Sequence, residues 1–121
     1  PRDARCILGR DATIGLSLEK GLEVEETEAL HVDYFGVSPV FDTRTKTDTG
    51  PPWGCIGIES LRDRGRHPLV GIGGITCENA AAVIRAGAQG VAVVSAICSA
   101  LDPRQSASKL AQAIGAIPCE K

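Results

Sequence analysis

The segment "PLVGIGGITCENAAAVIRAGAQGVAVVS", residues 68–95, contains two apolar runs with a helix-like stretch between them. Residues 68–75 and 90–95 are short and apolar, and glycine or proline bounds them, as in buried strands. In residues 77–88 the apolar side chains recur at helical spacing, and Gly87 lies where a helix would stop. This order predicts a βαβ unit, whose two strands are parallel.

The same alternation continues on both sides of this unit. We expect further strands at 12–17 and 32–38, and further helices at 18–30, 56–65 and 102–117. The last helix has Asp102 as its N-cap and Pro103 at its first helical position. Four strands that alternate with helices predict an α/β fold with a parallel sheet. Both an open doubly wound sheet and part of a (β/α)₈ barrel fit this order.

Length and charge limit the classes of function. The chain has 121 residues, 43% of them hydrophobic, which is enough for one modest domain. Its 13 basic and 15 acidic residues are interspersed, so we expect neither nucleic acid nor an anionic membrane as a partner. The apolar runs are shorter than a membrane span, and the first residues lack the apolar core of a signal peptide. We therefore expect a cytoplasmic protein.

The 5 cysteines occur singly, without a C-x-x-C pair, which predicts neither a zinc site nor a disulfide framework. A catalytic thiol paired with His31 or His67 is the less favoured interpretation, and buried or incidental cysteines are the favoured one. We predict no metal ligand in this chain.

Small and polar residues follow the predicted strands. Ser17, Gly73, Gly74 and Ser95 lie at strand ends, and a barrel would bring these ends around one mouth. The glycines would let backbone N–H groups approach an anion, and the start of the next helix adds a favourable partial charge. A tight turn between strand and helix is the alternative interpretation of a double glycine. Taken with Ser95, the glycines favour a phosphate site.

A polar loop, "SPVFDTRTKTDTGPP" (38–52), carries the most specific signal. Thr43, Arg44, Thr45 and Lys46 place two hydroxyls and two cations within four residues. Such donors can bind several phosphate oxygens, so the loop suits a diphosphate. The alternative is a solvated polar loop. The length of the loop, between a strand and a helix, favours a functional role.

Three motifs carry a resemblance that extends through nearly the whole chain. They are "DYFGVSPVFDTRTKTD" with "PPWG", "VGIGGIT" with "ENAAAVIRAGAQGVAVVSAI", and "DP". In this order they resemble the C-terminal half of the thiamine phosphate synthase family, also called thiamine-phosphate pyrophosphorylases. The resemblance implies that residues 1–121 are four consecutive βα units, strands 5 to 8, of one TIM (β/α)₈ barrel domain. The N-terminal half is absent, and "PRDARCILG" resembles the end of the fourth helix.

The resemblance also implies a reaction and its residues. The family is a transferase of thiamine biosynthesis that condenses hydroxymethylpyrimidine diphosphate with thiazole phosphate and releases pyrophosphate. Lys46 and Ser17 match its catalytic positions. The matching substrate-binding positions are Ser17, Thr43, Arg44, Thr45, Lys46, Gly74, Val94 and Ser95. We expect small phosphorylated substrates.

The family uses Mg²⁺, whose aspartate ligands belong to the missing N-terminal half. Asp3, Asp33, Asp42 and Asp48 do not match those positions. We therefore expect the fragment alone to be inactive, and its sheet edges to need the missing half or self-association. Two alternatives stay open: a non-catalytic half-barrel that binds phosphate, and a related thiazole tautomerase that transfers a proton through a histidine.

Overall fold

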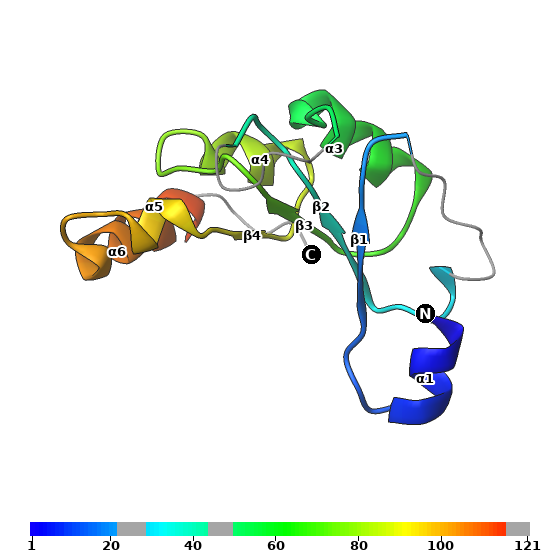
Figure 1. The fold of residues 1–121 in the computed structure, drawn as a ribbon. Coiled ribbons are helices and arrows are strands. Elements are labelled where there is room, and N and C mark those ends of the chain that lie inside the picture. Colours follow the sequence, from blue (N-terminus) through cyan, green and yellow to red (C-terminus); the bar gives the residue numbers. More distant parts are fainter. Residues whose placement is uncertain (22–28, 44–49, 116–121) are drawn as a thin grey trace.

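The computed structural model describes residues 1–21, 29–43 and 50–115, and within them four parallel strands form one sheet (Figure 1). The strands are β1 (Gly15–Leu18), β2 (Tyr34–Val37), β3 (Leu69–Ile72) and β4 (Gly90–Ala92). They lie side by side in chain order, so each new strand is added at the same edge. The α/β class and the parallel sheet predicted from the sequence are confirmed.

The strand register aligns small residues in one row across the sheet. Ser17 of β1 pairs with Gly36 of β2, Gly36 pairs with Val70 of β3, and Val70 pairs with Gly90 of β4. Side chains alternate between the two faces of a strand, so these four residues share a face. Ser17 was expected to end its strand, but β1 continues to Leu18, so Ser17 lies one residue before the end.

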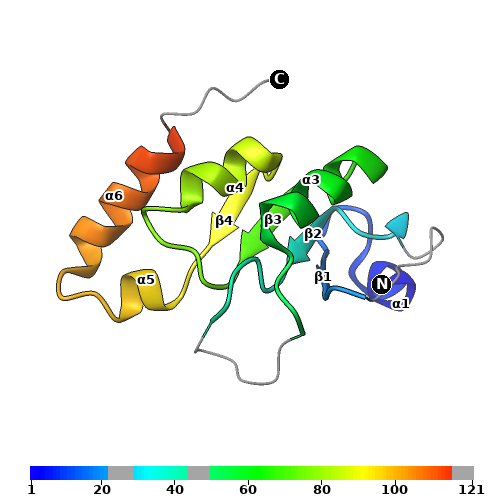
Figure 2. The same cartoon turned by 90° about the horizontal axis from the view of Figure 1, so that it is seen from above.

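Helices α3 (Gly54–Arg64), α4 (Ala80–Ala86) and α6 (Pro103–Gly115) lie on the other face of the sheet. The other helices of the described residues are α1 (Arg2–Leu8) and α5 (Ser95–Cys98). Figure 2 shows α3, α4 and α6 along the same side of the strands. Among the described residues, no helix is long and apolar enough to cross a membrane.

The core lies between the sheet and helices α3 and α4. Val37, Ile58 and Val83 contribute fully buried side chains from β2, α3 and α4. Burying an aliphatic side chain of this size stabilises the fold by about 1.5 to 3 kcal/mol. Gly71 of β3 faces this core, and a Cβ there would lie 2.9 Å from Cγ1 of Val83. The missing side chain therefore lets α4 pack closely on the strand.

Several predicted boundaries are wrong. Leu18 was expected to begin a helix, but it is the buried last residue of β1, and residues 22–28 of that expected helix lie outside the described part of the chain. The strand expected at 90–95 ends at Ala92, and Ser95 instead begins α5. The predicted start of α6 is confirmed, because Oδ1 of Asp102 accepts a hydrogen bond from the Gln105 N–H at 3.0 Å.

Arg5 connects α1 to the beginnings of β1 and β2. Its guanidinium donates to the carbonyls of Ala12, at 2.6 Å, and His31, at 3.3 Å, and contacts the Asp33 carboxylate at 2.7 Å. The same carboxylate accepts a 2.7 Å hydrogen bond from the Ile14 N–H. That backbone hydrogen bond, followed by the one from Arg5, lowers the pKa of Asp33 below its usual value. Both interactions favour the ionised form.

The lowered pKa of Asp33 predicts a pH-dependent stability. A carboxyl whose pKa is lower in the folded state stabilises the fold above its unfolded pKa, and this contribution is lost as pH falls through the folded pKa. We expect Asp33→Asn to reduce the loss of melting temperature between about pH 6 and about pH 3. Thermal unfolding followed by circular dichroism at each pH checks this.

Asp63→Asn is the matched control for this experiment. Asp63 also contacts an arginine, Arg62, at 3.1 Å, but its side chain is 69% exposed and the two residues are neighbours in the chain. Such surface pairs contribute little to stability. An acid profile that Asp33→Asn leaves identical to that of the unmodified protein would contradict the assignment.

Candidate anion site at the carboxyl ends of the strands

The loop after β2 is fastened to the ends of two other strands. The N–H groups of Val40 and Phe41 donate to the carbonyls of Ile72, at 2.9 Å, and Gly73, at 3.1 Å. At the far end of the loop, Nε1 of Trp53 donates to the Leu18 carbonyl at 3.3 Å. These hydrogen bonds therefore fix the base of the loop between β1 and β3.

The double glycine after β3 forms a tight turn against this loop. Gly73 and Gly74 have φ values of +101° and +65°, which side-chain-bearing residues rarely adopt. A Cβ at Gly73 would lie 2.9 Å from Cα of Pro39, and a Cβ at Gly74 would lie 2.6 Å from the Asp42 carbonyl oxygen. The glycines are therefore required by the turn and by the packing of the loop, in addition to any access that they give to an anion.

A cavity of about 110 Å³ lies beside this turn and the end of β4. Four of its lining residues were predicted as site residues, and they come from three segments of the chain: Thr43, Gly74, and the pair Val94 and Ser95. The others are Ser38, Ile72, Gly73, Ile75, Ala92 and Val93. A cavity that holds one water needs only about 10 to 15 Å³, so there is room for a small anion.

The cavity offers backbone donors. No hydrogen bond within the described residues uses the N–H groups of Gly74 and Ile75, which lie outside helices and strands. Ser95 begins the four-residue helix α5; the N–H groups of Ile97 and Cys98 donate to the Val94 carbonyl, whereas no hydrogen bond within the described residues uses those of Ser95 and Ala96. Backbone donors of this kind bind anions such as phosphate. An anion would therefore find neutral hydrogen-bond donors here, and none of the described residues that line the cavity carries a carboxylate.

The remaining predicted site residues are Ser17, Arg44, Thr45 and Lys46. Arg44, Thr45 and Lys46 lie outside the described residues; Thr43, directly before them in the sequence, lines the cavity. Ser17 does not line the cavity. It is exposed on β1, two strands from β3, which corresponds to about 10 Å across the sheet.

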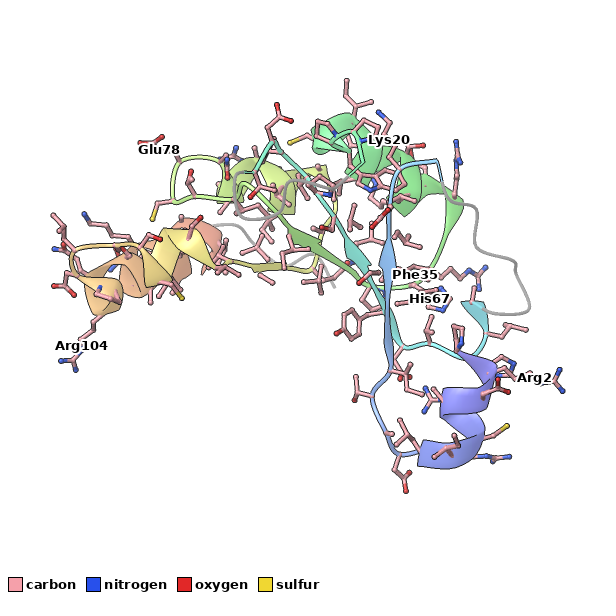
Figure 3. The ribbon with its side chains drawn as sticks, viewed as in Figure 1. Arg2, Lys20, Phe35, His67, Glu78 and Arg104 are labelled. Carbon is pink, nitrogen blue, oxygen red and sulfur yellow. The ribbon has the colours of Figure 1, made fainter. Side chains whose placement is uncertain are left out.

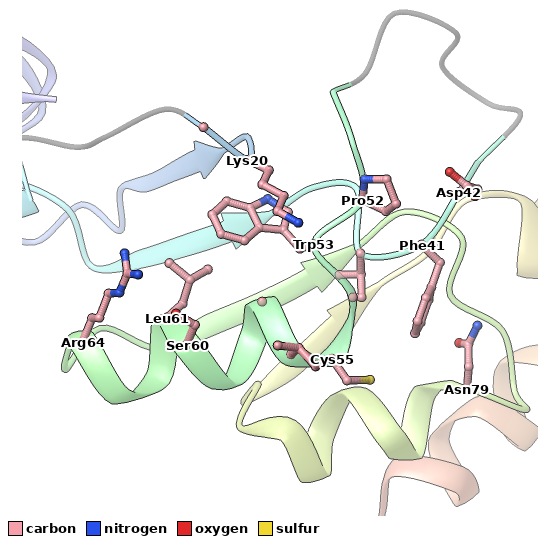
Figure 4. Close-up of a pocket in the computed structure, with 15 residues that line it drawn as sticks. Lys20, Phe41, Asp42, Pro52, Trp53, Cys55, Ser60, Leu61, Arg64 and Asn79 are labelled. Atoms are coloured by element: carbon pink, nitrogen blue, oxygen red, sulfur yellow. The ribbon is translucent and has the colours of Figure 1, made fainter.

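A second and larger hollow, of about 1060 Å³, lies on the other side of the loop base (Figure 4). Its lining residues include Val40, Phe41, Trp53 and Asn79. Trp53 and Asn79 were not predicted as site residues, although they lie inside the motifs "PPWG" and "ENAAAVIRAGAQGVAVVSAI". Their side chains bind backbone carbonyls, and such contacts leave no pattern in the sequence.

The two histidines lie at the amino ends of the strands, at the end of the sheet opposite to the cavity. His31 and His67 precede β2 and β3, and the His67 ring packs on Phe35 with ring centroids 4.7 Å apart (Figure 3). The cavity, in contrast, lies at the carboxyl ends of β3 and β4. Neither histidine is therefore placed to transfer a proton to a ligand in the cavity.

The fold and the cavity together define an α/β protein with a candidate anion site where parallel strands meet the following helices. The family model described as thiamine monophosphate synthase matches residues 1–97. The chain belongs to this thiamine monophosphate synthase family.

Curated relatives and a solved structure agree with this family. A thiamine-phosphate synthase of Albidiferax ferrireducens is 50% identical over 114 residues, which are 94% of this chain and 52% of the relative. A thiamine-phosphate synthase of Xanthobacter autotrophicus is 48% identical, over 94% of this chain and 54% of the relative. The structure of thiamine phosphate pyrophosphorylase from Pyrococcus furiosus superposes with a TM-score of 0.74 at 28% identity, over 96% of this chain and 55% of that one. The chain therefore spans about half the length of these relatives.

Proposed function

We propose that this chain forms the thiazole-phosphate half of the active site of a thiamine phosphate synthase. The complete protein would be a transferase that condenses hydroxymethylpyrimidine diphosphate with thiazole phosphate to give thiamine phosphate and pyrophosphate. The observation that carries this proposal is the cavity, where Thr43, Gly74, Val94 and Ser95, from the ends of three different strands, line one space. Membership of the family supplies the reaction.

In this proposal the cavity holds the phosphate of the thiazole. The N–H groups of Gly74 and Ile75 and the first turn of α5 would donate to its oxygens, and Thr43 would add a hydroxyl at the rim. Because the N–H donors are part of the backbone, they do not have to be ordered when the substrate binds. The phosphate would thereby position the thiazole nitrogen for reaction.

The diphosphate would be bound by Lys46, and Ser17 on β1 would contact the pyrimidine substrate. Arg44 and Thr45 would join Thr43 in binding the thiazole phosphate. In the reaction, the bond between the pyrimidine methylene carbon and the diphosphate oxygen breaks, and pyrophosphate takes the electron pair. The thiazole nitrogen then forms a bond to that carbon. A cation beside the departing diphosphate stabilises the charge that develops there. Lys46 and Ser17 are therefore the residues to which we assign catalysis.

A magnesium site is not formed by the described residues alone. They contain no group of three or more histidine, cysteine, aspartate or glutamate side chains that could hold a metal ion. Asp42, which lines the larger hollow, is a single exposed carboxylate. The Mg²⁺ that the family uses would thus take its protein ligands from the half of the relatives that this chain does not span. It would neutralise diphosphate oxygens when bound.

The arrangement of the sheet supports the interpretation that this chain forms half of a (β/α)₈ barrel. A doubly wound sheet reverses its strand order and carries helices on both faces. Here the order is β1-β2-β3-β4, and α3, α4 and α6 lie on one face (Figure 2). The row formed by Ser17, Gly36, Val70 and Gly90 would face the barrel interior. The other half of the barrel, or a second copy of this chain, would cover that face and the edges of β1 and β4.

The proposal can be tested by completing the protein. The chain would be joined at Pro1 to the first half of the Albidiferax ferrireducens relative, and this chimera is called the completed protein below. We expect the completed protein to form thiamine phosphate from both substrates and Mg²⁺, and the 121-residue chain to form none. Chromatography of thiamine phosphate and release of pyrophosphate give two independent readings. The first half of the relative alone is the negative control, and the intact relative is the positive one.

The outcomes separate the candidate functions. A folded completed protein that binds inorganic phosphate without forming thiamine phosphate would favour the non-catalytic half-barrel. Isomerisation of the thiazole without condensation would favour the tautomerase. The structure does not favour this outcome, because His31 and His67 precede β2 and β3 and so lie at the strand ends opposite the cavity.

A further inference from the structure

Asn79 occupies the N-cap position of α4 but does not cap the helix. An N-cap side chain ordinarily accepts a hydrogen bond from an N–H group of the first helical turn. The Asn79 side chain turns back to the preceding loop: Nδ2 donates to the Gly74 carbonyl at 3.0 Å, and Oδ1 accepts from the Thr76 N–H at 2.8 Å. Because one partner is an acceptor and the other a donor, the amide has only one orientation that satisfies both.

This contact completes a series of three anchored carbonyls. The carbonyls of Ile72 and Gly73 accept from the N–H groups of Val40 and Phe41, and the Gly74 carbonyl accepts from Asn79. In a trans peptide the carbonyl and the next N–H point in opposite directions. The N–H groups of Gly73, Gly74 and Ile75 are thus directed away from these anchors.

The anchors and the N–H groups lie on different sides of the turn. The anchoring residues Val40, Phe41 and Asn79 line the larger hollow (Figure 4) and do not line the anion cavity. Gly73, Gly74 and Ile75 do line the anion cavity. Fixing the carbonyls on one side therefore aims successive N–H donors at the cavity on the other.

We propose that Asn79 is a positioning residue for the phosphate of the thiazole substrate. It acts through the peptide between Gly74 and Ile75, whose rotation glycine otherwise permits at little steric cost. A rotated peptide would aim the Gly74 carbonyl at the anion and withdraw the Ile75 N–H. The identity of the phosphorylated ligand rests on the proposed function, whereas the role of Asn79 in holding an oxyanion donor does not.

Asn79→Ser in the completed protein tests this role. Serine keeps a side chain that favours the N-cap of α4, but it is too short to hold both Gly74 and Thr76. We expect the dissociation constant of inorganic phosphate and the KM of thiazole phosphate to rise about tenfold, the effect of losing one well-placed donor. We expect kcat to stay within about twofold, because the chemistry at the thiazole nitrogen is unchanged at saturation. Asn79→Ala should behave alike.

Gln89→Ala is the matched control. Gln89 also uses a side-chain amide to bind backbone, since its Oε1 accepts from the Leu69 N–H at 2.7 Å, but it does so at the amino end of β3. We expect this variant to lose melting temperature without a change in phosphate affinity. Amide chemical shifts of Gly74 and Ile75 on phosphate titration give a reading independent of turnover.

Two results would overturn the positioning role. One is a phosphate dissociation constant for Asn79→Ser equal to that of the unmodified protein, with a loss of melting temperature like that of Gln89→Ala. The other is a phosphate-induced chemical-shift change of the Ile75 amide that is the same in Asn79→Ser and in the unmodified completed protein. If the completed protein forms no thiamine phosphate but Asn79→Ser still weakens phosphate binding, the positioning role stands and the proposed function fails.

Discussion

Gly74→Ala is expected to destabilise the completed protein by about 2 to 4 kcal/mol and to abolish phosphate binding in the cavity. The glycine has φ +65°, and a Cβ on it would lie 2.6 Å from the Asp42 carbonyl oxygen and 2.8 Å from Cβ of Phe41. Backbone atoms cannot yield as a flexible side chain can, so the loop or the turn must move. Urea denaturation and phosphate titration measure the two effects.

Gly9→Ala separates conformational strain from the clash. Gly9 has φ +82°, but no atom lies within 4 Å of the Cβ that alanine would add. We expect this control to cost about 1 to 3 kcal/mol, because residues with a side chain rarely adopt a φ of +82° together with a ψ of −175°, and to leave phosphate binding intact. If Gly74→Ala lowers the free energy of unfolding no more than Gly9→Ala does, the conclusion that the loop leaves no room for a side chain at Gly74 is wrong.

Lys46→Ala is expected to reduce kcat of the completed protein by about 100-fold or more, with little change in melting temperature. The reason is chemical: the departing diphosphate loses a cation that neutralises its growing charge. The KM of thiazole phosphate should change less, because that substrate is assigned to the cavity beside Gly74 and Ser95. Steady-state kinetics with each substrate varied in turn distinguishes the two effects.

Lys109→Ala is the control for charge alone. Lys109 is an exposed lysine of α6, and its loss should leave kcat within about twofold. A Lys46→Ala variant that keeps the unmodified turnover would remove Lys46 from the catalytic residues. The family assignment, which rests on the match of residues 1–97, would survive that result.

The order of strands and helices could be predicted because it depends on local pattern. Apolar runs such as 68–75 and the N-cap pair of Asp102 and Pro103 are readable within a few residues. Boundaries were less predictable. Leu18 fits a helical pattern with the residues after it, but its burial against the core places it in β1. Likewise, "GVAVVS" does not reveal that its last residue begins a helix.

The composition of the cavity was partly predictable for a different reason. Carboxyl ends of parallel strands meet at one edge, so Gly74 and Ser95 could be expected together from topology alone. The hydrogen bonds of Arg5, Trp53 and Asn79 could not, because each joins a side chain to backbone carbonyls that carry no sequence signal. Long-range contacts of this kind require coordinates.

The Leu18 carbonyl serves two donors, the Ser38 N–H at 3.2 Å and the Trp53 indole at 3.3 Å. One oxygen thus ties both the entry and the exit of the loop to the end of β1. Trp53 is the single tryptophan of the chain, so its intrinsic fluorescence reports on this junction without any label. A change in emission on adding either substrate would show that ligand binding reaches the junction between the loop and the end of β1.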